Sequence, residues 1–379
     1  MIRGGFWRYF DFSLVGAMTI LVIIGVTMIR SAIAGNIELT TTTPLVDRQI
    51  IFGVAGFVML LVMAAIDYRI WGSLSLQLYI GIIVVLLALN IIGAALFGSA
   101  RWFRTTLVFI QPSEFAKIVM ILVMADYFSK RLHLMHEPKW TIRSFLMMMG
   151  ITVWVILQPN LSTSIVLIVL WFVLIWIAGL PVKHLIAYAL TGIAVLSISF
   201  PLLVEFEIIK EYQLGRITNF LAPADPDDLT ARYGDRYNID QALVSIGSGG
   251  LFGQGYGQGP QVQLRFLKVR WSDFIFSATA HELGFVGALL IILLMAFVVY
   301  RCLWAARVAP DAFGALICYG VATLIAFQAL VNLGVNLNLM PATGLTLPFV
   351  SYGGSSLVAN MIALGLVESV IMRRKVIES

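Results

Sequence analysis

Residues 273–300 read DFIFSATAHELGFVGALLIILLMAFVVY, an acid followed by an apolar run of transmembrane length. About 20 apolar residues in a helix cross the hydrocarbon core of a bilayer. Such a run is helical because lipid offers no hydrogen bonds to the backbone. The segment therefore predicts a membrane helix that begins beside a carboxylate.

The rest of the chain repeats this apolar pattern. Of its 379 residues, 60% are hydrophobic and 12% are charged, far from the composition of a soluble domain. The alternating segments that mark transmembrane barrels do not occur in the sequence. We predict an all-α, polytopic membrane protein in which residues 1–379 form one membrane domain. Its ten expected spans are 12–34, 48–66, 76–97, 111–129, 142–158, 161–179, 184–206, 273–300, 312–337 and 346–371.

The distribution of basic residues predicts the orientation, because short cytoplasmic loops are enriched in lysine and arginine. With the N-terminus inside, the inner segments carry 13 basic residues and the short outer loops carry 4. Both termini are therefore expected in the cytoplasm, and residues 207–272 form a long extracytoplasmic loop. The run from 12 to 34 is too long for the core of a signal peptide, so we expect it to be a retained first span.

The long loop is the main polar stretch of the chain, and its charges are unevenly placed. Residues 241–272 carry three bases and no acid, and they end directly before Asp273. Asp273 admits two interpretations: it caps the following helix, or it acts as a general base at the membrane surface. The glycines of residues 247–259 form either an ordinary turn-rich loop or a backbone site for an anionic head group.

A second polar site is predicted at the start of the span 111–129. Glu114 and Lys117 are three residues apart and share one helix face. Charges within a span usually face the protein interior or a water-filled cavity. The pair is either a structural ion pair or part of a cavity wall, with Arg101 just outside it. In residues 340–356, prolines and the glycine pair Gly353-Gly354 predict a broken segment that lines a cavity.

Several classes of site are not indicated. Cys302 and Cys318 lie in or beside apolar runs, so we expect buried thiols rather than a disulfide or a metal site. The net charge of +5 is not accompanied by a nucleic-acid-binding motif, so no nucleic-acid partner is expected. His281 and Glu282 are expected to contact neighbouring elements, since Glu282 points away from Asp273 around an ideal helix.

Together, four motifs give the chain a resemblance to the SEDS family, which includes RodA, FtsW and SpoVE. They are Pro348–Ser356, Gln111–Lys117, Gly247–Gly253 and Ser272–Phe276, and they occur in the same order along nearly the whole chain. The resemblance implies the SEDS fold and a peptidoglycan glycosyltransferase of the bacterial cytoplasmic membrane. Such enzymes polymerise lipid II, the undecaprenyl-pyrophosphate-linked disaccharide peptide, at the outer face of that membrane.

The resemblance also implies roles for particular residues. The essential acid of the family corresponds to Asp273, which becomes the expected catalytic base. Arg101, Glu114, Lys117, Lys268 and Arg270 are the expected substrate-binding residues, with the cations directed at the pyrophosphate. The absence of a second, nucleophilic carboxylate suggests inversion at the anomeric carbon. The resemblance implies no definite cofactor, and a divalent cation at the leaving pyrophosphate is left open.

The partner implied by the resemblance is a class B penicillin-binding protein, a transpeptidase with one membrane span. An elongation role of the RodA type is preferred to a division role of the FtsW type. The chain departs from the usual family pattern at Asn160 and His281, where acids are common, so neither receives a catalytic role. Two other functions compete with polymerisation: a lipid II flippase, and a scaffold that only recruits the transpeptidase.

Overall fold

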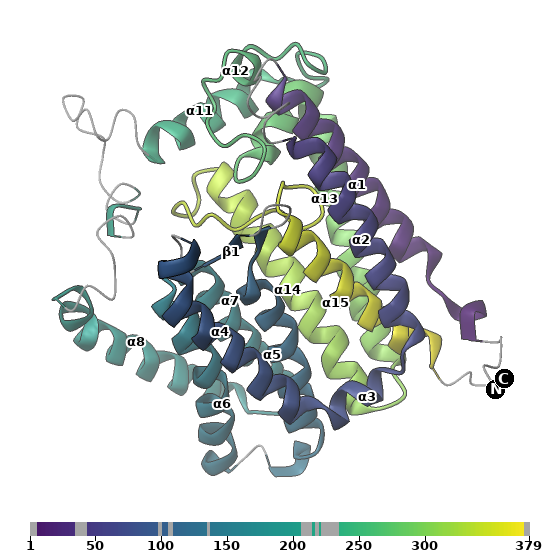
Figure 1. The fold of residues 1–379 in the computed structure, drawn as a ribbon, viewed down its shortest axis with the longest axis vertical. Helices are drawn as coiled ribbons and strands as arrows, with labels where there is room; N and C mark the ends of the chain where they lie inside the picture. The colour runs from purple at the N-terminus through teal and green to yellow at the C-terminus, as the bar shows by residue number, and fades with distance from the viewer. Residues whose placement is uncertain are drawn as a thin grey trace.

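The computed structural model describes residues 6–34, 44–97, 101–104, 109–134, 137–205, 214–216, 220 and 235–374. Long helices dominate this part of the chain and pack into a bundle (Figure 1). Ten of them correspond one to one with the ten predicted spans. They are α1 (Phe12–Ile33), α2 (Leu45–Ala65), α4 (Ser75–Phe97), α5 (Pro112–Ser129), α6 (Pro138–Leu157), α7 (Leu161–Ile177), α8 (Val182–Glu205), α13 (Ile275–Val308), α14 (Ala312–Asn336) and α15 (Gly354–Met372).

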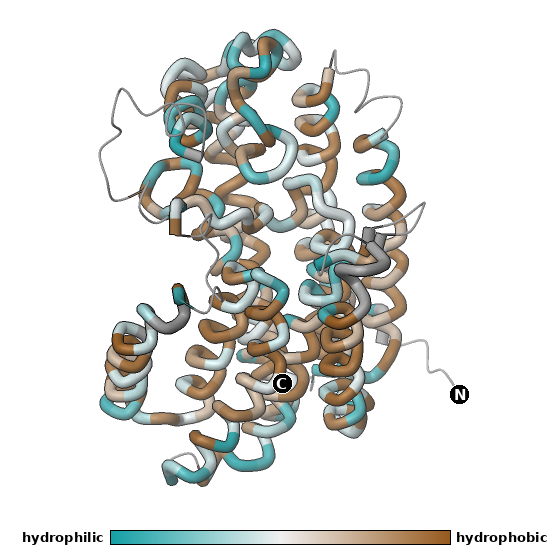
Figure 2. Tube along the Cα trace, turned by 60° about the vertical axis from the view of Figure 1, so that its left-hand side comes forward, coloured by the Kyte–Doolittle hydropathy of each residue, from teal (hydrophilic) through white to brown (hydrophobic). Residues whose placement is uncertain are grey.

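Among the described residues, seven of these helices are both long and apolar enough to cross a membrane unaided. α4 and α7 are apolar over shorter stretches, and α5 carries Glu114 and Lys117 in its first turns. Apolar residues run along the helices, while polar residues gather toward the ends of the bundle (Figure 2). The composition that predicted a multi-pass membrane protein is thus matched by the helices.

Short polar residues fix the helix ends. Asp11 accepts hydrogen bonds from the backbone N–H groups of Ser13 and Leu14 and so caps α1. Asn160 caps α7 by accepting from Thr163 N at 3.3 Å, at the boundary predicted between the spans 142–158 and 161–179. Asp311 caps α14 through Gly314 N at 2.8 Å. Each cap satisfies an N–H group that lacks a partner within its own helix.

The start of the first span, α1, and the end of the last span, α15, lie on the same side of the molecule. Asp11 N, at the start of α1, donates to Glu368 near the end of α15 at 3.1 Å. Arg301, toward the end of α13, forms an ion pair with Asp11. Nearby, α3 (Tyr68–Ser73) joins this polar end of the bundle. An even number of spans, as the sequence predicts, requires this arrangement.

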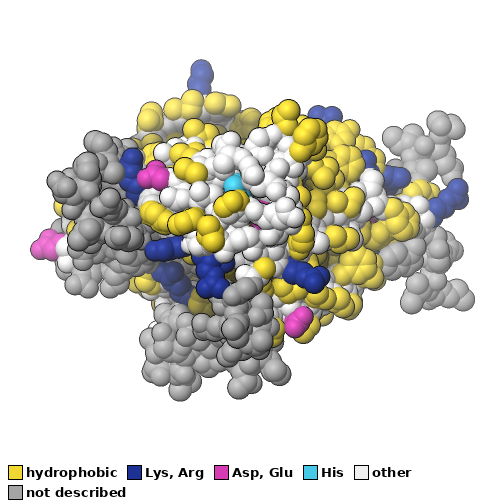
Figure 3. Space-filling model, turned by 90° about the horizontal axis from the view of Figure 1, so that it is seen from above, with side chains coloured by type: hydrophobic (Ala, Val, Ile, Leu, Met, Phe, Trp, Pro, Cys, Tyr) yellow, Lys and Arg dark blue, Asp and Glu magenta, His cyan; other side chains and the backbone are white. Residues whose placement is uncertain are grey.

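The long predicted loop contains structure of its own. Its described part holds α11 (Asp235–Ser248) and the single turn α12 (Pro260–Gln263), which cover the opposite end of the bundle (Figure 1). Most of the acidic first half lies outside the described residues. Seen from this covered end, the surface mixes apolar and basic side chains with few acids (Figure 3).

Candidate active site

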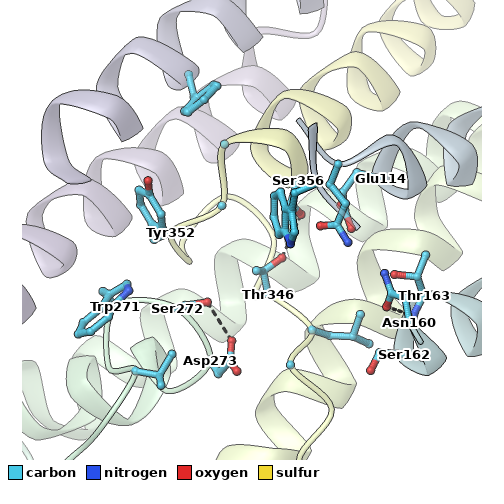
Figure 4. A pocket seen from close by; sticks show the side chains of 18 of the residues that line it. Glu114, Asn160, Ser162, Thr163, Trp271, Ser272, Asp273, Thr346, Tyr352 and Ser356 are labelled. Carbon is cyan, nitrogen blue, oxygen red and sulfur yellow. Dashed lines mark hydrogen bonds between the residues drawn. The ribbon is translucent and has the colours of Figure 1, made fainter. Parts of the chain in front are cut away.

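A cavity of about 500 Å³ lies where α2, α5 and α7 meet the segments that precede α13 and α15. It is lined by Arg48, Phe52, Trp102, Gln111, Glu114, Asn160, Ser162, Thr163, Val269, Trp271, Ser272, Asp273, Gly344, Leu345, Thr346, Tyr352, Gly353, Gly354 and Ser356. Asp273 projects from one side, and Glu114 and Asn160 lie across the space from it (Figure 4). The predicted polar cavity therefore exists, and it brings Asp273 and Glu114 together.

Asp273 is held by a network on both its side chain and its backbone. Ser272 Oγ donates to Asp273 Oδ1 at 2.8 Å. The carbonyl of Asp273 accepts from Asn332 Nδ2 at 3.1 Å and from Asn336 Nδ2 at 3.0 Å. Both asparagines are buried on α14, so the position of Asp273 is fixed by a neighbouring helix.

Of the two interpretations of Asp273, the helix cap is wrong. α13 begins at Ile275, and its cap residue, Phe274, makes no side-chain cap bond. Asn336 supplies the acceptor instead, since its Oδ1 receives Ser277 N at 3.1 Å and Ser277 Oγ at 2.6 Å. The cap of α13 thus comes from another helix, and Asp273 lines the cavity.

The segment before α15 is non-helical, as its prolines and glycines predicted. Although 346–371 was expected as one span, α15 starts only at Gly354. Ser351 Oγ donates to the carbonyl of Ser272 at 2.8 Å, and Tyr352 N donates to that of Trp271 at 2.9 Å. These bonds join the segment to the stretch that carries Asp273, and together they form one wall of the cavity.

Glu114 and Lys117 combine the two roles that the sequence left open. Lys117 Nζ lies 2.8 Å from Glu114 Oε2, and the lysine is 1% exposed. Glu114 also lines the cavity, whereas Lys117 is not among the lining residues. Glu114 and Lys117 thus form a buried ion pair, and Glu114 is also part of the cavity wall.

The other expected cations lie elsewhere. Arg101 donates through Nε to the carbonyl of Gln158 at 2.9 Å and through Nη2 to that of Pro159 at 2.5 Å, while the adjacent Trp102 reaches the cavity. Lys268 is exposed, 5.7 Å from the ring of Tyr237. The structure brings neither residue to the cavity lining.

Arg270 is buried rather than directed at the cavity. It is 3% exposed, and its Nε donates to the carbonyl of Ala32 at 2.6 Å. Burial lowers the pKa of its guanidinium, with Arg265 adding a like-charge contribution. Because arginine titrates far above neutral pH, the group keeps its charge and anchors the end of α1.

Two arginines near Asp273 were not identified from the sequence as site residues. Arg48, at the start of α2, lines the cavity and hydrogen bonds with Tyr352. Arg216 Nη1 lies 3.4 Å from the carbonyl of Thr343, beside Gly344. The sequence did offer a signal for Arg48, which is a charge at the predicted outer start of an apolar span. That charge was used only to predict the orientation of the chain in the membrane.

The glycine-rich stretch does not form an open anion site. The N–H groups of Gly253, Gln254 and Gly255 donate to backbone carbonyls, two of which belong to His281 and Glu282 on α13. Glu282 is fully buried and accepts from Ser31 Oγ, as expected for a contact with another helix. Within the described residues, no group of three His, Cys, Asp or Glu side chains is arranged as metal ligands would be.

Comparison with known proteins identifies the family to which this chain belongs. The family model described as cell cycle protein, FtsW/RodA/SpoVE, matches residues 12–376. The chain belongs to this family.

Two relatives illustrate its range. Stage V sporulation protein E of Bacillus subtilis (strain 168) is 33% identical over 95% of this chain and 96% of its own length. Peptidoglycan glycosyltransferase MrdB of Escherichia coli (strain K12) is 34% identical over 88% of this chain and 87% of its own.

A solved structure matches nearly the whole chain. It concerns the structural coordination of polymerization and crosslinking by a peptidoglycan synthase complex, and the matched chain has a TM-score of 0.77 at 27% identity. The match covers 96% of this chain and 97% of the other. The SEDS fold expected from the motifs is therefore confirmed, and the chain is a multi-pass membrane protein.

Proposed function

We propose that this protein is a peptidoglycan glycosyltransferase that polymerises lipid II at the outer face of the bacterial cytoplasmic membrane. The observation that carries the proposal is the Asp273 carboxylate, which projects into a 500 Å³ cavity opposite Glu114. A cavity of this size suits a sugar-containing head group. The relatives named as peptidoglycan glycosyltransferases support the same reaction class.

In the proposed reaction, Asp273 acts as a general base. Its carboxylate takes the proton from the attacking hydroxyl of one disaccharide as that oxygen bonds to the anomeric carbon of another. The bond from that carbon to the pyrophosphate oxygen breaks, and undecaprenyl pyrophosphate leaves with the bonding electrons. A single displacement inverts the anomeric centre. The role of Asn332 and Asn336 is to hold the base in reach of the hydroxyl.

Binding of the pyrophosphate needs cations at the cavity. Arg48 lines it directly, and Arg216 lies near the Asp273 side. Arginine forms paired hydrogen bonds with phosphate oxygens, so Arg48 is our first candidate for this contact. Lys117 acts through Glu114, and Arg101 acts by fixing the turn beside Trp102. Lys268 and Arg270 remain predictions as substrate contacts, since neither lines the cavity here.

The proposed setting follows from charge and from the relatives. The excess of basic residues on the inner segments supports cytoplasmic termini. The similarity to a chain of a peptidoglycan synthase complex supports a partner that crosslinks the product, and a class B penicillin-binding protein is that partner in our proposal. An elongation role stays a prediction, as do a divalent cation at the pyrophosphate and the absence of any other cofactor.

The test uses purified full-length protein with its transpeptidase partner and lipid II in detergent. We expect glycan chains from the wild type and at least a 100-fold lower rate from Asp273→Asn, within the usual contribution of a general base. Asp240→Asn, an exposed acid on α11, is the matched control and should retain full activity. Normal polymerisation by Asp273→Asn would show that the mechanism is wrong.

The competing functions predict different results for the same variant in vesicles and in cells. A flippase would move lipid II across sealed vesicles without making glycan, and it needs no base at the outer surface. A scaffold would leave cell growth unaffected by Asp273→Asn. Adding Mg²⁺ or Mn²⁺ after chelation measures whether a divalent cation assists the leaving group.

A further inference from the structure

The glycine-rich part of the long loop is built into a break in α13. At Gly284, φ is 69° and ψ is −167°, so the helix is interrupted there. Phe285 N and Val286 N donate to the carbonyls of Gly250 and Leu251 at 2.8 and 3.1 Å. In return, Gln254 N and Gly255 N donate to the carbonyls of His281 and Glu282, each at 3.0 Å. We call residues 249–257 the inserted segment.

Glycine makes this close approach possible. A Cβ atom at Gly253 would lie against the carbonyl of Glu282, and one at Gly284 would lie 2.5 Å from the carbonyl oxygen of Leu251. Both glycines also have positive φ, at 82° and 69°, which disfavours other residues. The inserted segment is therefore packed backbone to backbone against α13 and leaves the backbone groups at the break paired.

The inserted segment nevertheless presents two large apolar side chains outward. Leu251 is 65% exposed and Phe252 is 79% exposed. The helix residues bonded to this segment, Phe285 and Val286, are also exposed. They begin an exposed apolar stripe that continues along α13, a helix long and apolar enough to span a membrane, through Leu289, Leu290, Leu293, Phe297 and Tyr300. Leu251 and Phe252 thus adjoin the exposed apolar stripe of a candidate membrane span.

The rise per residue of α1 and α13 gives the distance of the inserted segment from the far end of the bundle. Asp11 and Arg301 form an ion pair at the end of the bundle that the distribution of basic residues assigns to the cytoplasm. Phe285 is 16 residues from Arg301 along α13, about 24 Å at the rise of an α-helix. Tyr256 donates to the carbonyl of Thr27 at 3.0 Å, and Thr27 is 16 residues from Asp11, again about 24 Å. Both distances are shorter than the roughly 30 Å thickness of the hydrocarbon core. Tilting the helices would reduce them further when they are measured along the bilayer normal.

We propose that the inserted segment lies within the outer leaflet of the membrane and that Leu251 and Phe252 contact lipid hydrocarbon. Backbone outside a helix is tolerated at this depth only when its polar groups are satisfied by the protein, and the bonds to α13 do this. The exposed apolar side chains then belong to the lipid interface rather than to water. The outer part of α13, which leads to Asp273, is held between the membrane and α14. This inference does not depend on the proposed reaction.

The test measures the depth of a probe at Phe252. The full-length protein carries Phe252→Cys labelled with bimane and is reconstituted in phosphatidylcholine vesicles containing nitroxide lipids. Both native cysteines are fully buried, so labelling should be confined to the new site. We expect lipids with the nitroxide near the head group to quench most of the fluorescence, and aqueous iodide to quench little. Leu251→Cys, read in the same way, provides a second position should Phe252→Cys fold poorly.

Two labelled controls bracket the result. Leu293→Cys, on the exposed apolar stripe of α13, should be quenched best by nitroxides deep in the chains. Asp240→Cys, on the exposed face of α11, should be quenched by iodide alone. If both loop positions behave like Asp240→Cys, the proposal is overturned, and the apolar pair is left as a surface for a protein partner.

Discussion

Replacing Asn336 with leucine tests whether α14 positions the catalytic aspartate. The change keeps the branched side-chain skeleton but removes the acceptor for Ser277 N and Ser277 Oγ, and the donor to the carbonyl of Asp273. An unsatisfied buried group costs about 1–3 kcal/mol, and a lost helix cap costs about 1 kcal/mol. Because these terms overlap, we expect a loss of about 2–3 kcal/mol in stability.

The effect on rate should be separable from the effect on folding. A displacement of the base by about 1 Å lowers the rate of a positioned reaction by roughly 100-fold, which equals about 2.7 kcal/mol. The assay is glycan synthesis from lipid II at a temperature where thermal unfolding shows the variant still folded. The expected signature is a lower kcat with little change in KM.

The matched control is Asn90→Leu. Asn90 Nδ2 donates to the carbonyl of Trp154 at 3.0 Å, so a partly buried interhelical amide hydrogen bond is lost at a site that does not line the cavity. This variant should lose stability but keep its rate. If folded Asn336→Leu polymerises at the wild-type rate, α14 does not position Asp273 in the way argued here.

Three further predictions follow from buried contacts. Glu114→Gln should cost about 3–5 kcal/mol, because it leaves Lys117 buried without its charge partner; adding Lys117→Met should recover stability in thermal unfolding but not polymerisation. Gly253→Ala should lower the melting temperature much more than Gly257→Ala: both sites have positive φ, but only Gly253 meets backbone atoms. Burial acts to raise the pKa of Asp311, but hydrogen bonds from Tyr68, Gly314 N and Arg69 lower it overall. Its contribution to folding stability is therefore present above the unfolded pKa of about 4 and is lost as pH falls through the lower folded pKa. Thermal unfolding between pH 7 and pH 3 should therefore show a smaller acid-dependent loss for Asp311→Asn than for the wild type, and an equal loss would contradict this.

Much of the site could be anticipated because it depends on local chemistry. The pairing of Glu114 with Lys117 follows from helix periodicity, and the broken segment before α15 follows from its prolines and glycines. The cavity cations could not be assigned in the same way. Arg270 is close to Asp273 in sequence but is held by Ala32 of α1, whereas Arg48 is distant in sequence and lines the cavity.

The sequence by itself determined the membrane class, the ten long helices, and the acid at the start of α13. These features depend on the length of the apolar runs and on the spacing of residues along them, which determine directly where a helix can cross a bilayer. Only the tertiary structure decided that Asn336 caps α13 in place of Asp273, and that the glycines of the long loop fill a break in that helix. Both depend on where backbone groups from distant segments find partners, and such pairing is set by packing rather than by local pattern.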